Sequence, residues 1–272
     1  MKPFYQIAGV SKQAHQQYIN RQADSSDRTA YYIGLMAQAR ALHPRIGLAK
    51  IYYLFEPAGI GRQAFENLGK AAGYALEPRP VLTWKGYRSI PYTNLLSDHL
   101  FNGADQIWVT DITYYKIGEK YFYISMIMDF YLRKIIAANV AESLHASHSI
   151  ALLRQALKAR QITPCQGLIH HSDKGSRYTS GAYTELLKKY KIGISMCTSV
   201  FENTSMERLN GIIKNDYLIH CSPSTFNQLK KQLKLAVTNY NNCPHGQLNM
   251  MSPNKYECHL ENIPLSQRTL MK

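Results

Sequence analysis

The stretch LIHHSDKGSRYTS, residues 168–180, decides how the middle of this chain folds. Its first two residues begin an apolar run that is typical of a buried strand, and Asp173 follows just past the end of that run. Residues 174–176 are turn residues. We therefore expect a strand, a turn that carries Asp173, a helix over 180–190 and a second short strand over 192–196.

A second acidic residue, Glu207, falls in the first turn of a further expected helix. Apolar residues recur along that helix at helical spacing and predict its buried stripe: Met206, Leu209, Ile213 and Tyr217. Lys214 lies two turns after Glu207, so the two side chains share a more open face. Thr204 precedes Glu207 at the spacing of a capping box, which would explain the glutamate without any chemistry.

The third acidic residue lies upstream, in the segment QIWVTDITYY at residues 106–115. Its β-branched and aromatic residues predict a strand, and Asp111 stands in the middle, on the face of Ile107 and Val109. Aspartate is a poor strand former, and an unpaired buried carboxylate costs several kcal/mol. A divalent metal ion shared with other carboxylates would compensate that charge.

Asp111, Asp173 and Glu207 thus belong to three different elements, as a two-metal site for phosphoryl transfer requires. Mg²⁺ prefers oxygen ligands, and two ions roughly 4 Å apart stabilise both the attacking and the leaving oxygen. The three carboxylates are therefore candidate catalytic residues and candidate metal ligands.

The segments WVTDITY (108–114) and HHSDKGSRYTS (170–180), followed by Asn203 and Glu207, closely resemble the core of DDE integrases. Within that group the chain resembles, over nearly its whole length, the second-frame (OrfB) transposases of the insertion-sequence-three family. The resemblance implies a ribonuclease-H-like integrase core, which is an α/β fold with a mixed sheet flanked by helices. It also implies a small α-helical DNA-binding region before that core, and two Mg²⁺ ions, with Mn²⁺ as a substitute.

The implied activity is metal-dependent cleavage of DNA 3′ ends and strand transfer of an insertion sequence. The implied partners are double-stranded DNA (element ends and target), further copies of this chain and an upstream-frame (OrfA) protein, all in the bacterial cytoplasm at the nucleoid. Two other functions are open: a ribonuclease-H-like nuclease without strand transfer, and a non-catalytic DNA-binding regulator.

The charge of the chain fits a nucleic-acid partner. The net charge is +14, from 32 Lys and Arg against 18 Asp and Glu, and both halves are basic. We expect the DNA contacts to come from a set of polar and basic residues: Lys174, Arg177, Asn203, Arg208, Lys214, Arg62, Lys85 and Arg88. No signal peptide and no apolar run of about 20 residues is visible. The five cysteines include no Cys-x-x-Cys, which argues against a disulfide framework or a tight zinc site.

Four regions are expected along the chain. A helical, helix-turn-helix-like region covers 1–76, and an extended basic and aromatic linker covers 77–104. The ribonuclease-H-like catalytic core covers 105–220, and a C-terminal helix and tail over 221–272 complete it.

In the first region we expect a helix, a turn and a second helix over 5–22, and a linker or helix start at 24–27. A helix over 28–42 follows, with Ile33, Met36, Ala37 and Ala41 at helical spacing. Two more helices are expected over 48–55 and 61–73. Together they form either a DNA-binding unit or a plain helical packing domain.

In the core, three strands over 107–116, 121–130 and 134–140 predict an antiparallel meander, followed by a helix over 147–161. Asp129 ends the second strand, and we interpret it as a structural partner of Arg133 or of a backbone donor. His170 and His171 are interpreted either as satisfied structural histidines or as contacts to DNA phosphate.

The last region begins with a long helix after Ser222, whose lysines ride on its outer face. Its final segment resembles the C-terminal signature of the family, except that Cys243 stands where the family usually has arginine. A phosphate or carboxylate contact expected at that position is therefore in doubt.

Overall fold

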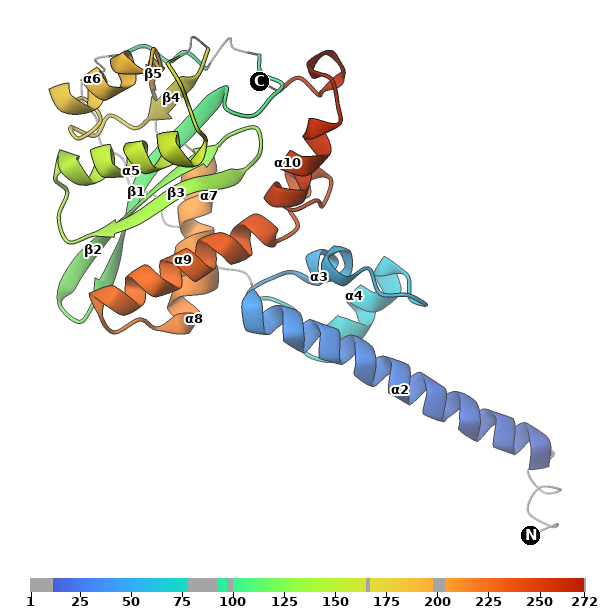
Figure 1. The fold of residues 1–272 in the computed structure, drawn as a ribbon. Helices are drawn as coiled ribbons and strands as arrows, with labels where there is room; N and C mark the ends of the chain where they lie inside the picture. Colours follow the sequence, from blue (N-terminus) through green and yellow to red (C-terminus); the bar gives the residue numbers. More distant parts are fainter. Residues whose placement is uncertain (1–11, 78–91, 97–99, 165–166, 198–203, 272) are drawn as a thin grey trace. The chain divides into compact units, whose positions relative to one another are not determined.

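The computed structural model describes residues 12–77, 92–96, 100–164, 167–197 and 204–271 (Figure 1). The chain divides into two compact units, Met1–Pro78 and Arg79–Lys272. Among the described residues no helix is long and apolar enough to span a membrane.

The first unit is helical and begins with α2 (Lys12–Leu42), a helix of 31 residues. The linker or helix start expected at 24–27 is therefore wrong, because this helix begins earlier and runs through these residues. No proline interrupts residues 12–42, and Ser and Asp lower helix stability by only roughly a few tenths of a kcal/mol each. The first helix and the turn expected over 5–22 fall largely outside the described residues.

The buried face of α2 also differs from the expected one. Tyr32, Met36 and Ala39 are buried, whereas Ala37 and Ala41 are exposed. Only Met36 belongs to both sets. The partners of the helix decide this, because α3 (Leu48–Phe55) and α4 (Arg62–Ala71) both pack on α2.

Phe65 of α4 is the fully buried centre of this unit. Its ring meets those of Tyr32 and Tyr52 at centroid distances of 6.1 and 5.8 Å. Gly69, one turn later, lies against Leu48, where a Cβ would come within 2.4 Å of a Leu48 methyl carbon. Glycine at 69 thus lets α4 approach α3 closely.

The second unit is built on one five-stranded sheet in the order β3-β2-β1-β4-β5. Its strands are β1 (Ile107–Ile117), β2 (Lys120–Asp129), β3 (Lys134–Ala141), β4 (Ile169–Ser172) and β5 (Gly193–Met196). β1 and β2, and β2 and β3, are antiparallel, whereas β4 pairs with β1 and β5 in parallel. The expected meander is confirmed, and the sheet is mixed.

Helices cover both faces of the sheet (Figure 1). The helices α5 (Ala146–Ala159) and α6 (Gly181–Lys189) pack around Trp108 on one face. On the other face lie α7 (Thr204–Ile212), the π-helix η2 (Ile213–Leu218), the single turn α8 (Ile219–Cys221) and α9 (Phe226–Asn242). The four residues of the expected stripe, Met206, Leu209, Ile213 and Tyr217, are all buried in this second core.

The C-terminal segment is tied to the sheet by polar contacts. Asn241 of α9 accepts a hydrogen bond from the N–H of Ile135 and donates one to its carbonyl oxygen, both at 2.9 Å. Glu257 of α10 (Pro253–Glu261) pairs with Lys134 and Arg160. The sheet edge at β3 is thus covered by a helix.

Candidate active site

Asp111 and Asp173 are brought together by strand register. Val109 of β1 pairs with His171 of β4 in parallel, and each aspartate stands two residues further along its own strand direction. Neighbouring strands lie about 4.8 Å apart, and residues two apart point to the same face. The two carboxylates therefore meet where the parallel strands end, on the face that α7 covers.

Asp111 is anchored by α7. Asn210 donates a hydrogen bond from Nδ2 to Oδ2 of Asp111 at 2.9 Å. Burial and the neighbouring Asp173 charge raise the pKa of Asp111 to about 7, while the backbone N–H of Ile112 and the Arg177 guanidinium act in the opposite direction. This carboxylate is a group that a cation would stabilise strongly.

Asp173 stands in a tight turn that shapes its carboxylate. Its Oδ1 accepts a hydrogen bond of 3.0 Å from the N–H of Gly175, and its Oδ2 lies 3.7 Å from Nη2 of Arg177. A Cβ at residue 175 would lie 2.9 Å from Oδ1 of Asp173 and 3.0 Å from Nη2 of Arg177. Gly175 therefore leaves room for the ion pair beside the aspartate.

Glu207 lies at the margin of this carboxylate pair. It stands in the first turn of α7, exposed, and its charge adds to the rise in the pKa of Asp111. Among the residues that the structure describes, no three Asp, Glu, His or Cys side chains are close enough to hold one ion. The structure thus joins Asp111 and Asp173 and places Glu207 near them without closing a three-ligand site.

The capping-box alternative for Glu207 finds no support. The helix begins at Thr204 itself, so this residue is not the residue before the helix. Within the described part of the chain, no hydrogen bond joins Thr204 and Glu207, and the exposed carboxylate faces the side of Asn210.

A buried polar layer lies beneath Asp111. Thr110 donates from Oγ1 to the carbonyl oxygen of Met126 at 2.8 Å, and the Tyr178 hydroxyl lies 3.4 Å from the same Oγ1. His170 lies behind them and shares a hydrogen bond of 2.9 Å between Nε2 and the Tyr183 hydroxyl. Burial lowers the pKa of His170 to about 3, so this histidine is neutral and structural.

His171 is equally buried. Its ring nitrogens lie 2.8 Å from Ser195 Oγ and 3.1 Å from Cys197 Sγ. The interpretation as a satisfied structural histidine fits these contacts, and a buried ring has no surface to offer a DNA phosphate.

Asp129 is fully buried and away from this pair. Its two oxygens accept hydrogen bonds from the backbone N–H groups of Asp105, at 2.6 Å, and Leu132, at 2.9 Å. These are the backbone donors that the sequence interpretation allowed for, and they hold the turn between β2 and β3.

The candidate DNA contacts fall into three groups. Asn203, Lys85 and Arg88 lie outside the described residues. Arg62 belongs to the first unit, where it pairs with Glu66 at 3.5 Å. Four lie in the second unit: Lys174, Arg177, Arg208 and Lys214.

Two of those four make contacts that bear on their role. Arg177 forms an ion pair with Asp173, so its charge acts on the carboxylates of the site. Lys214 places its amine 5.8 Å from the centroid of the Tyr114 ring, which is 60% exposed. Arg208 is exposed on α7 and forms no ion pair with any described residue.

Sequence analysis missed Asn210. The residue is 7% exposed, and its Oδ1 is buried without a hydrogen-bond partner among the described residues. The sequence did contain a signal for this residue. Asn210 stands three residues after Glu207, and residues three apart on a helix lie on the same face. The role of Asn210 could be recognised only once the position of Asp111 relative to α7 was known.

These side chains fit a divalent cation. Two carboxylates lie side by side, one of them half-buried with a raised pKa, and Asn210 adds an oxygen that has no partner among the described residues. An all-oxygen donor set of this kind is what Mg²⁺ prefers.

Comparison with known proteins gives a family match over residues 102–199, to the model described as "Integrase core domain". The match includes Asp111 and Asp173 and ends before Glu207. A transposase-like protein of Haemophilus influenzae is 30% identical over 168 residues, covering 60% of this chain and 76% of that protein.

Two further relatives carry transposase names. The transposase for insertion sequence element IS629 of Shigella sonnei is 36% identical over 112 residues, covering 40% of this chain and 37% of that protein. Transposase InsF for insertion sequence IS3A of Escherichia coli is 25% identical over 173 residues, covering 60% of this chain and 58% of that protein. The chain thus matches between about a third and three fifths of the length of these two relatives.

Among solved structures, a chain of the simian T-cell lymphotropic virus intasome in complex with PP2A regulatory subunit B56 gamma matches with a TM-score of 0.50 and 16% identity. The match covers 84% of this chain and 76% of that one. At this identity the likeness concerns the fold, and the expected integrase-core fold is confirmed.

Proposed function

We propose that this chain, which belongs to the DDE-type transposases of the insertion-sequence-three family, cuts the 3′ ends of a DNA element and joins them to target DNA. In the first step, water attacks a phosphodiester and leaves a free 3′-hydroxyl. In the second, that hydroxyl attacks a phosphodiester of the target, so one P–O bond forms as another breaks. The observation that carries the proposal is the register that sets Asp111 beside Asp173 where β1 and β4 end their pairing.

Asp111 and Asp173 would hold divalent cations, and Glu207 would complete the ligand set from α7. When bound, two Mg²⁺ ions supply Lewis acidity to the scissile phosphate and lower the pKa of the attacking hydroxyl group. With its pKa near 7, Asp111 carries a proton on about half of the molecules at neutral pH, and a cation would displace it. The number of ions and the role of Glu207 are parts of the proposal.

The remaining residues of the site orient and balance these charges. Asn210 holds one oxygen of Asp111 by a hydrogen bond. Arg177 neutralises part of the Asp173 charge, and the tight turn at Gly175 keeps the two in contact. Phosphoryl transfer depends mainly on such positioning and charge.

DNA is the proposed substrate and partner, in keeping with the net charge of +14. An element has two ends, and each chain contributes one carboxylate site, so we propose that at least two copies act together. We also propose that an upstream-frame protein assists in recognising the element ends.

The test uses the full chain and a labelled duplex that carries an end of the element. Cutting and joining are followed with Mg²⁺, with Mn²⁺ and without metal, for the wild type and for Asp111→Asn, Asp173→Asn and Glu207→Gln. Each variant should lose both reactions and keep DNA binding, because it removes a ligand charge with little change in shape.

Each other outcome has a meaning. Near-normal strand transfer by any one variant would contradict the three-carboxylate assignment. Cutting without joined products would identify a nuclease, and DNA binding without metal-dependent cutting would identify a regulator.

A further inference from the structure

A polar cavity lies in the sheet-bearing unit, separate from the carboxylates of Asp111 and Asp173. Its volume is about 180 Å³, and it opens between the turn after β2, the first turn of α7 and the end of α9. Among the described residues, the polar side chains on its wall include two arginines and no acid: Arg133, Thr204, Ser205, Arg208, Tyr240, His245 and Gln247. We call it the Arg133–Arg208 pocket.

Arg133 is a buried arginine in the wall of this pocket. Its side chain is buried, at 8% exposure, and its guanidinium lies 4.0 Å from the centroid of the Phe130 ring. It donates from Nη1 to Ser205 Oγ at 3.2 Å, whereas its Nε is buried without a partner among the described residues. A buried cation is normally paired with an acid, and Arg133 has no such pair within the described part of the chain.

The nearest acid does not supply that counter-ion. Asp129 precedes Arg133 in the same turn, but two backbone N–H groups take up its carboxylate. No ion pair within the described residues includes Arg133 or Arg208. Burial lowers the pKa of Arg133, Tyr240 and the Asp129 charge act in the opposite direction, and the Arg208 charge lowers it again.

The rest of the wall also favours an anion. Thr204 and Ser205 open α7, where the first N–H groups of a helix point outward without intrahelical partners. The hydroxyl of Ser205 and the amide of Gln247 add hydrogen-bond donors. Guanidinium groups, a helix start and hydroxyls together are the donors that bind phosphate oxygens.

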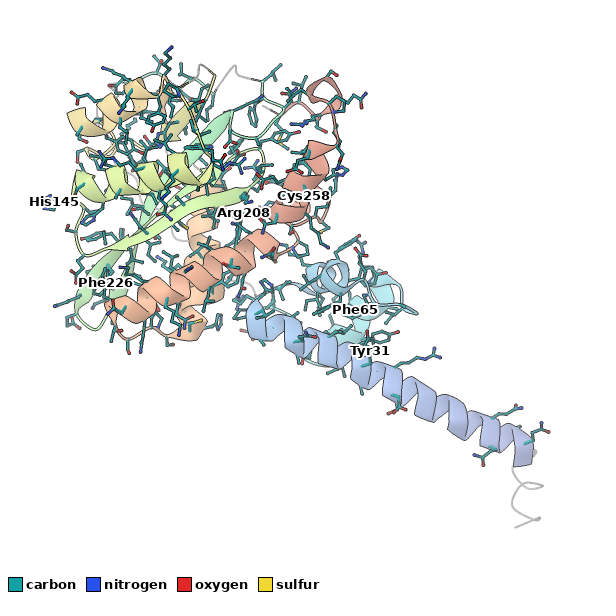
Figure 2. All side chains as sticks on the ribbon, in the orientation of Figure 1. Tyr31, Phe65, His145, Arg208, Phe226 and Cys258 are labelled. Atoms are coloured by element: carbon teal, nitrogen blue, oxygen red, sulfur yellow. The ribbon has the colours of Figure 1, made fainter. Side chains whose placement is uncertain are left out.

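The pocket and the carboxylate pair lie on different faces of α7. Arg208, labelled in Figure 2, points about 160° away from Asn210 around the helix axis at ~100° per residue. An anion in the pocket is therefore not the scissile phosphate. Bound there, it would hold α7, and with it Glu207, against the turn after β2.

We propose that the Arg133–Arg208 pocket binds a phosphate group, supplied by the backbone of a DNA strand on the face of α7 that points away from Asn210. The choice of DNA as the source rests on the proposed function. The phosphate chemistry rests on the pocket alone.

The first experiment measures inorganic phosphate binding to the full, metal-free chain by calorimetry and by thermal unfolding at constant ionic strength. The variant is Arg208→Gln, whose exposed side chain can be replaced without disturbing the core. The matched control is Arg154→Gln, because Arg154 is an exposed arginine of α5, on the other face of the sheet. Phosphate should raise the unfolding midpoint of the wild type and the control, and Arg208→Gln should weaken phosphate binding by tenfold or more.

The second experiment measures binding of a labelled DNA duplex at several salt concentrations. Removing one phosphate contact should flatten the slope of log K against log salt by about one unit in Arg208→Gln and not in Arg154→Gln. Neither experiment involves cutting, so a failed cutting assay leaves them interpretable, and their failure leaves the carboxylate assignment untouched.

Equal phosphate binding by Arg208→Gln and the wild type would overturn the site. Loss of phosphate binding with an unchanged salt slope would overturn DNA as the source and leave a site for free phosphate.

Discussion

Nδ2 of Asn210 lies 2.9 Å from Oδ2 of Asp111, so a single hydrogen bond ties the helix that carries Glu207 to the strand that carries the half-buried aspartate. The contact joins residues 99 apart in sequence. It fixes both the rotamer of Asp111 and the distance of α7 from the sheet.

Asn210→Ala should weaken the metal site more than the fold. Groups that orient metal ligands contribute about 10- to 100-fold in metal affinity, so the Mn²⁺ concentration for half-maximal cutting should rise by about that factor. DNA binding should stay the same. Asn227→Ala, an exposed asparagine on α9, serves as the control. Unaltered metal dependence in Asn210→Ala would mean that Asp111 needs no anchor.

Asp111 should make the metal-free protein less stable as pH rises. Its pKa is about 7 in the fold and about 3.8 in the unfolded chain, so the folded state binds the extra proton. That stabilisation is complete below about pH 3.8 and is lost as pH rises through about 7. Between pH 5 and 8 the free energy of unfolding should therefore fall less steeply in Asp111→Asn than in the wild type.

The same comparison with Mg²⁺ present gives the check. A bound cation stabilises the ionised carboxylate, so the wild-type curve should flatten in this pH window while that of Asp111→Asn should not change. Parallel curves for the two proteins without metal would show that Asp111 has no raised pKa.

Asp129→Asn should lower stability and spare the chemistry. Asp129 accepts hydrogen bonds from two backbone N–H groups, and in the variant the amide NH₂ would face one of these donors. The lost hydrogen bond should lower the free energy of unfolding by about 1–3 kcal/mol. Thermal unfolding and turnover measured on one preparation decide the matter. A variant that is stable and inactive would move Asp129 into the active site.

Lys214→Ala should weaken DNA binding for all sequences about equally. The amine lies 5.8 Å from the centroid of the exposed Tyr114 ring, and we expect it to contact a DNA phosphate there. The slope of log K against log salt should flatten by about one unit. Lys230→Ala is a close control, because Lys230 lies 5.3 Å from the ring centroid of Phe226 on α9. Equal slopes for both variants would mean that Lys214 only covers the tyrosine.

Gly175→Ala should impair catalysis through the position of Asp173. The new methyl group would meet Oδ1 of Asp173 at 2.9 Å, so the carboxylate or the turn must shift. Misplacement of about 1 Å costs on the order of 100-fold in rate. Gly181→Ala is the control, because a Cβ there meets nothing within 4 Å. Full activity of Gly175→Ala would show that the turn adapts freely.

The strands, the turn at Asp173 and the stripe of α7 could be predicted from the sequence alone. Period-two patterns, turn residues and helical spacing are local properties. They locate both ends of β1, β2 and β3 to within one residue. The fold class followed from these elements together with the family resemblance. The same local rules failed at Asp24–Asp27, because weak helix formers do not end a helix that has no proline.

Only the tertiary structure decided which residues meet. The neighbours in the sheet set Asp111 beside Asp173, and the packing of α7 on β1 brings Asn210 to Asp111. The Arg133–Arg208 pocket likewise forms from segments more than 100 residues apart. A sequence pattern reports the spacing of apolar residues within one segment. Contacts between distant residues depend on where a second segment lies, and its position is fixed only when both segments pack in the same core.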